Sequence, residues 1–146
     1  MKSLAYHAAK LAIRPKGPLE EAIFEHIWQQ TPIETVLAAL MDSEVFFYSQ
    51  NPADTVPGGA DPKPLAMHGA DGKPVMLVFT RRERAASVAK QLPDPAAAPL
   101  AMPFREVLRW APIELGLVIN FGSAVQAHCT SAHMDTLRRQ SGVFRP

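Results

Sequence analysis

Two short polar stretches of the sequence contain residue types that could do chemistry. The first is HCTSAH followed by Asp135, which places a cysteine, two histidines and a carboxylate close together. A thiol with a lowered pKa can act as a nucleophile, and a thiolate with imidazoles can bind zinc. However, His128 and Cys129 are adjacent and face opposite ways in an extended chain, and compact zinc sites pair two close couples of ligands. We therefore interpret His128, Cys129 and His133 as an incidental cluster, with a hydrolase or transferase centred on Cys129 as the alternative.

The second stretch, TRRER, follows an apolar run and begins a helical pattern. The free backbone N–H groups of a helix start can bind an anion, and Arg81 and Arg82 would lie in that first turn. Against an anion site, Glu83 offsets the positive charge, and the spacing of Thr80 and Glu83 predicts a capping box that satisfies one donor. The residues favour solvated arginines and leave the anion site as an alternative.

The segment GLVINFGS ends an apolar run with Asn120 and then turns. Asparagine can bond its own downstream backbone and glycine accepts positive φ, so the simplest interpretation is a turn that fixes the strand end. If the strands before Thr80 and Asn120 run parallel, ligands would bind beyond their carboxyl ends. The candidate ligand-binding residues are then Thr80, Arg81, Arg82, Asn120, Gly122 and Ser123.

Several helices are expected around these residues. The segment from Pro18 to Gln30 places Leu19, Ile23 and Ile27 on one face, and a second helix follows at Thr31 and Pro32, where Glu34 completes a capping box. Further helices are predicted from Thr80 to about Leu92, from Pro103 as the first helical residue to Trp110, and from Ser131 as the cap to Gln140, with Gly142 as a stop.

The strands are expected to be short, and they alternate with the helices. Two apolar runs without alternation predict neighbouring central strands, Val75–Phe79 and Leu115–Asn120, and an Asp-Gly turn predicts a hairpin before the first. The proline-rich segment Asn51–Pro64 is predicted to be a loop. The five predicted strands are Val45–Ser49, Leu65–His68, Val75–Phe79, Leu100–Met102 and Leu115–Asn120.

Composition and charge narrow the function classes. Hydrophobic residues make up 47% of the 146 residues and charged residues 20%, which is typical of one soluble domain. The net charge of +1 does not favour nucleic acid, and no apolar stretch is long enough for a membrane span. A single cysteine excludes an internal disulfide, and Lys10 and Arg14 interrupt any signal-like segment, so we expect a cytoplasmic protein without a metal or cofactor.

Between Leu19 and Ser123 the order of elements resembles the N-terminal domain of the SseB family, which is named for enhanced serine sensitivity. The segments that carry the resemblance are GKPVMLVFTRRERA, PFREVLRWA and GLVINFGS. In the last of them, Phe121 stands at a position at which the family usually has proline. The resemblance implies a single α+β domain with a mixed sheet, its core at about 19–123, and no C-terminal SseB domain in this chain. It implies no established reaction.

Two hypotheses of different class follow. The first is a non-enzymatic interaction or regulatory domain that binds another protein, with Trp28, Trp110 and Phe121 as aromatic residues to look for on an exposed apolar patch. The second is a small-molecule module that binds an anionic metabolite in the crevice at the strand ends. A homo-oligomer is compatible with both.

Overall fold

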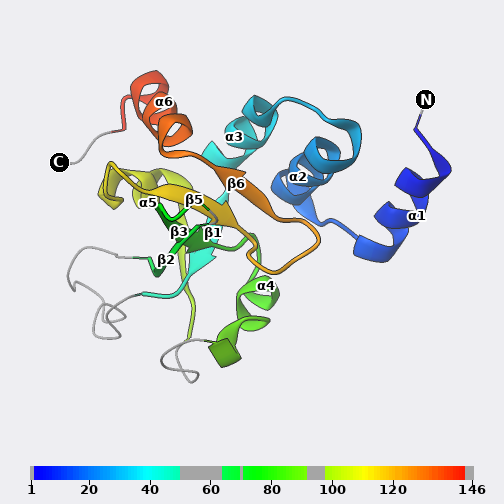
Figure 1. Cartoon of the computed structure of the whole chain (residues 1–146), viewed down its shortest axis with the longest axis horizontal. Coiled ribbons are helices and arrows are strands. Elements are labelled where there is room, and N and C mark those ends of the chain that lie inside the picture. The colour runs from blue at the N-terminus through cyan, green and yellow to red at the C-terminus, as the bar shows by residue number, and fades with distance from the viewer. Residues whose placement is uncertain (1, 50–63, 70, 92–97, 144–146) are drawn as a thin grey trace.

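Six α-helices and two small β-sheets form the fold in a computed structural model that describes residues 2–49, 64–69, 71–91 and 98–143 (Figure 1). The class is therefore α+β, as predicted. The predicted proline-rich loop Asn51–Pro64 lies outside the described residues except for Pro64. The predicted helix end at Leu92 also lies outside them.

The larger sheet positions the candidate site. Its strands are β2 (Ala66–His68), β3 (Pro74–Val78), β5 (Gly116–Ile119) and β6 (Ala127–Cys129), in the order β2-β3-β5-β6. The two central strands, β3 and β5, run parallel, and each outer strand pairs antiparallel to its neighbour. The prediction that these two apolar runs are neighbouring central strands is confirmed, and the parallel direction meets the condition that was set for the crevice.

The prediction of one five-stranded sheet needs correction. Strand β1 (Glu44–Phe47) pairs with β4 (Leu100–Pro103) in a separate two-stranded sheet. The two sheets are joined by isolated bridges: the Phe46 N–H donates to the Phe79 carbonyl at 2.8 Å and the Phe79 N–H donates back at 2.7 Å, and Ser49 pairs with Pro64. Isolated bridges do not continue a ladder, and apolar runs alone do not reveal which edges pair.

Two elements were not predicted, α1 (Leu4–Ile13) and β6. The Ser3 hydroxyl caps α1 by accepting from the Tyr6 N–H at 3.1 Å, so three helices rather than two lead the fold. The segment around His128 and Cys129 is a strand rather than a loop, because it pairs along β5. As expected for extended chain, His128 is exposed and Cys129 is buried.

Most helices cover one face of the larger sheet. Helices α2 (Gly17–Gln29), α3 (Ile33–Met41), α5 (Phe104–Trp110) and α6 (Ser131–Ser141) contribute to a main core that includes the side chains of alternate β3 and β5 residues. These inward residues are Met76, Val78, Leu117 and Ile119. In Figure 1, α1 lies at the edge of the molecule, with α2 between it and the sheets.

A smaller core lies under α4 (Arg82–Ala86), which continues into a 3-10 turn at Ala89–Gln91. It consists of Tyr48, Phe79, Ala85 and Val88, and Phe121 packs against it. The Phe121 ring is thus half-buried in this cluster. The helix is shorter than predicted, since α4 ends at Ala86.

Two predicted capping boxes, at Thr31 and Thr80, are wrong. Helix α3 has Pro32 at its N-cap without a side-chain cap, and the Thr31 hydroxyl is buried without a partner among the described residues. Helix α4 has Arg81 at its N-cap, because the Thr80 hydroxyl is used elsewhere, as described below. At Thr80 the carboxylate of Glu20 is a stronger acceptor than the capping partner that the local spacing offers.

The expected starts of the last two helices are each displaced by one residue. Thr130, not Ser131, caps α6, in a reciprocal pair with His133: the Thr130 hydroxyl accepts from the His133 N–H at 3.2 Å. Pro103 is the N-cap of α5 and not its first helical residue. Gly142 ends α6 at a φ of 70°, as predicted.

Candidate functional site

Asn120 joins the ends of the two parallel strands. Its backbone has a φ of 59°, in the left-handed region, which turns the side chain back along the sheet. The Asn120 Oδ1 accepts from the Thr80 N–H at 2.9 Å, and its Nδ2 donates to the Val125 carbonyl at 3.1 Å. The side-chain amide therefore adds one more link between β3 and β5 after both strands have ended.

Beyond this link lies the carboxylate of Glu20, from the first turn of α2. It is fully buried and accepts from the Thr80 hydroxyl at 2.5 Å and from the Arg81 Nε at 2.9 Å. Arg84 adds two bonds, Nε to Oε2 at 3.2 Å and Nη2 to Oε1 at 3.1 Å. The Lys16 N–H also donates to Oε1, at 3.0 Å. The two oxygens thus receive five hydrogen bonds from α2, α4 and the end of β3.

These contacts keep Glu20 ionised. Burial by itself raises the pKa of a carboxyl group, but the hydrogen bonds from Arg84, Thr80 and Arg81 and from the Lys16 backbone outweigh burial here. They lower the pKa of Glu20 from its ordinary value of 4.5 to about 2. The site is a charged network that is saturated by the protein's own groups.

The structure brings three of the six predicted site residues together, Thr80, Arg81 and Asn120. The remaining three are placed differently. The Arg82 guanidinium lies 5.4 Å from the centre of the Phe46 ring, and Gly122 and Ser123 belong to the turn after Asn120. The Gly122 N–H is bonded to the Gln126 side chain at 2.9 Å, and the Ser123 hydroxyl accepts from the Val125 N–H at 3.1 Å.

Sequence reasoning missed Glu20. It was not among the candidate site residues, although it lies in a segment that was expected to form a helix. The signal was its spacing, because it lies three and four residues before the buried Ile23 and Phe24 and so shares their helix face. A carboxylate at a core position needs cationic partners, and Arg81 and Arg84 supply them.

A cavity of about 460 Å³ adjoins Thr80 at the start of α2. Among its lining residues are Asp42, Glu44 and Lys16, so carboxylates outnumber cationic side chains there. An anionic metabolite in this cavity would face two carboxylates and a single cationic side chain, that of Lys16. The electrostatics at the strand ends therefore suit a cationic or neutral group better than an anion.

The cysteine and histidine cluster does not converge. Cys129 is buried, and burial raises the pKa of its thiol to about 12. His128 is exposed on the opposite side of β6, while the His133 Nδ1 accepts from the Thr130 N–H at 3.1 Å. Across the described residues, no three His, Cys, Asp or Glu side chains are close enough to hold a metal ion.

Four of the five exposed large apolar side chains among the described residues lie on α1 and α2, and the fifth is Ile113. Leu4 is 86% exposed and Leu11 76%, and on α2 Ile27 is 42% and Trp28 39% exposed. Ile27 was expected to face the core with Leu19. The opposite side of α1 is well anchored, since Tyr6 is buried, its ring meets Phe24 edge-on and its hydroxyl donates to Glu25. We call Leu4, Leu11, Ile27 and Trp28 the α1–α2 face.

The comparison with protein families identifies the family to which the chain belongs. Residues 19–134 match the model of the SseB protein N-terminal domain, and the chain belongs to that family. The match extends past the expected core at 19–123 and includes β6 and the first residues of α6. Comparisons with curated proteins and with solved structures found no match. In the described residues, no helix has the length and apolar character to cross a membrane.

Replacing Glu20 with glutamine should lower the free energy of unfolding at pH 7 by about 3 kcal/mol, because two arginines lose a buried anionic partner. The folded pKa lies below the unfolded one, so this contribution is present above pH 4.5 and is lost as the pH falls towards 2. Denaturant unfolding at several pH values should therefore show a steeper acid loss in the wild type than in Glu20→Gln. Glu21→Gln, on the exposed side of α2, is the matched control and should stay within about 0.5 kcal/mol.

Cys129 should be inert to a thiol reagent in the native protein at neutral pH and should react at once in denaturant. A thiol with a pKa of about 12 is protonated at pH 7, and its burial blocks access. The rate of colour release from a disulfide reagent measures this. Rapid native labelling would contradict the burial and revive the cysteine-based alternative.

Proposed function

We propose that the chain is a non-enzymatic interaction domain that binds an acidic surface of another protein through its α1–α2 face. The observation that carries the proposal is the exposure of Leu4 and Leu11, which lie seven residues apart and therefore on one side of α1. Ala8 lies between them on the same side and is exposed as well. Leucines that project fully into solvent from a well-anchored helix are typical of a contact surface.

Charge indicates the kind of partner. From Lys2 to Leu19 the sequence contains four Lys and Arg residues and no Asp or Glu. His7 and Arg14, which are exposed, flank the leucine stripe at helical spacing. A second copy of α1 would bring like charges together, whereas a surface that carries Asp and Glu around an apolar strip would be complementary. The matched family segment begins at Leu19, so α1 precedes it.

The small-molecule alternative at the strand ends has weaker support. An external anion would compete with Glu20, which is already held by Arg81 and Arg84. It would also approach Asp42 and Glu44, which line the adjoining cavity. The interaction proposal needs no such displacement, because Leu4 and Leu11 are already exposed.

The test compares partner binding by the wild type and by the double variant Leu4→Gln, Leu11→Gln. A protein retained by immobilised wild type is identified, purified and titrated. The proposal predicts at least a 10-fold loss of affinity in the double variant, since each leucine contributes about 1.5 to 3 kcal/mol when buried. It also predicts weaker binding at higher salt, because basic and acidic surfaces meet.

Ile113→Gln provides the matched control, because Ile113 is an exposed apolar residue outside the α1–α2 face. It should bind like the wild type, and circular dichroism should show that all variants are folded. Equal retention of every protein by all variants would contradict the proposal. A dimer in sedimentation that the double variant loses would also contradict it, because the partner would then be a second copy.

A further inference from the structure

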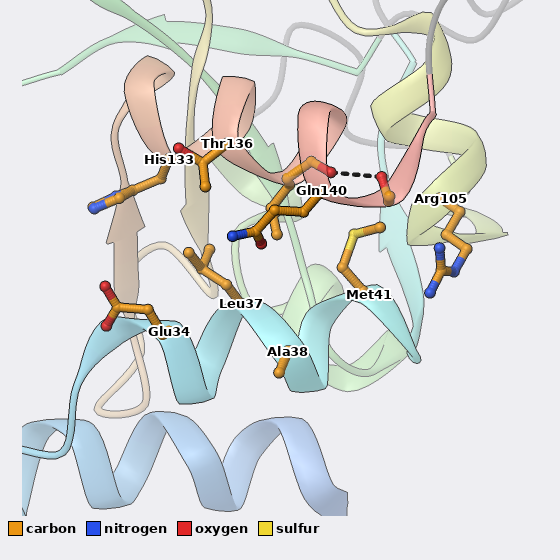
Figure 2. A pocket seen from close by; sticks show the side chains of 10 residues that line it. Glu34, Leu37, Ala38, Met41, Arg105, His133, Thr136 and Gln140 are labelled. Atoms are coloured by element: carbon orange, nitrogen blue, oxygen red, sulfur yellow. Dashed lines mark hydrogen bonds between the residues drawn. The ribbon is translucent and has the colours of Figure 1, made fainter.

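A groove of about 330 Å³ lies between α3 and α6 and shares no residue with the α1–α2 face or the Glu20 network (Figure 2). Its volume is within the range of small-molecule sites, which often form between helices. The floor is apolar: Leu37 and Met41 from α3 and Leu137 from α6 line it, and the core holds them in place. An apolar group in this groove would therefore contact a fixed surface.

The two ends of the groove carry opposite charges. Figure 2 shows Glu34 and His133 at one end and Arg105 beyond Met41 at the other. Glu34 and Met41 are seven positions apart in α3, which corresponds to about 10 Å along the helix. Within the described chain Glu34 is in no ion pair, and the Arg105 guanidinium lies 3.8 Å from an exposed carboxylate, that of Asp42. Both charges remain accessible to a ligand.

Polar groups along the groove can bind an amide backbone. The His133 Nδ1 accepts from the Thr130 N–H, so a neutral ring carries its proton on Nε2 and that atom is a donor. Gln140 projects into the groove in Figure 2 and offers both an amide donor and an acceptor. Leu37 and Leu137 adjoin these groups, so the lining alternates between polar and apolar contacts.

We infer that the groove binds a short peptide of three or four residues with free termini and an apolar side chain. Its ammonium group would pair with Glu34, its carboxylate with Arg105, and its side chain would cover Leu37, Met41 and Leu137. An extended tripeptide spans at most about 10 to 11 Å and a tetrapeptide about 13 to 14 Å, so three or four residues cover the stretch from Glu34 past Met41 towards Arg105. A single amino acid is too short to reach both, and an anionic metabolite leaves Glu34 without a counterpart.

The experiment is a titration of the labelled protein with the tripeptide Ala-Leu-Ala, followed by nuclear magnetic resonance of the methyl groups. Signals of Leu37, Met41 and Leu137 should shift together, with a Kd on the order of 0.1 to 1 mM for a ligand of this size. Acetylating the N-terminus or amidating the C-terminus should each weaken binding by about two- to five-fold, as expected for exposed charge pairs.

Variants of the protein test which charged residue binds each terminus of the tripeptide. Acetylating the tripeptide should not weaken its binding to Glu34→Gln any further. Amidating the tripeptide should not weaken its binding to Arg105→Gln any further. Glu21→Gln and Arg109→Gln are the matched controls, because both residues are exposed and neither lines the groove. The inference is overturned if the tripeptide causes no shift of the groove methyl groups, or if both caps are without effect on the wild type. Shifts caused only by a longer amphipathic helical peptide would also overturn it and would indicate a protein helix as the occupant.

Discussion

The fold depends on one buried carboxylate. Glu20 is fully buried, and its oxygens accept from Thr80, Arg81 and Arg84 and from the Lys16 backbone. A buried charge is tolerated only when it is paired and fully hydrogen-bonded, so α2, α4 and the end of β3 must meet at this point. Asn120 extends the constraint to β5, because it bonds the Thr80 N–H. The hydrogen bonds of Glu20 therefore hold α2 against the end of β3, in addition to the apolar packing of the helix.

The Glu20 network explains why arginines gather at the start of α4. The features that favoured an anion site were the arginines and the open backbone donors after β3. An anion does bind there, but it belongs to the same chain, since Arg81 and Arg84 contact Glu20. The polar residues at the strand ends consequently stabilise the domain. Binding is better sought on surfaces whose groups are not already used, which are the α1–α2 face and the groove between α3 and α6.

The sequence predicted the elements far better than their partners. The apolar runs of β3 and β5 and the amphipathic faces of α2 and α3 are local patterns, and they appeared where expected. Edge strands carry weaker patterns, so β6 was not among the predicted strands, and its pairing with β5 is a tertiary contact. The cap predicted at Thr80 failed because its hydroxyl bonds a carboxylate 60 residues away. Such contacts depend on tertiary structure, which the spacing of residues within one segment does not encode.

The central claim is that Glu20 is an ionised internal anion, and its pKa is the most direct test. The side-chain carboxyl carbon of Glu20, observed by nuclear magnetic resonance in protein labelled at glutamate, can be titrated with acid while the fold is monitored. The account predicts a pKa of about 2, because the hydrogen bonds from Arg84, Thr80 and Arg81 outweigh the effect of burial. It also predicts that added phosphate leaves the Glu20 signal unchanged. A pKa near 4.5, or displacement of the signal by phosphate, would contradict the account and restore an open anion site.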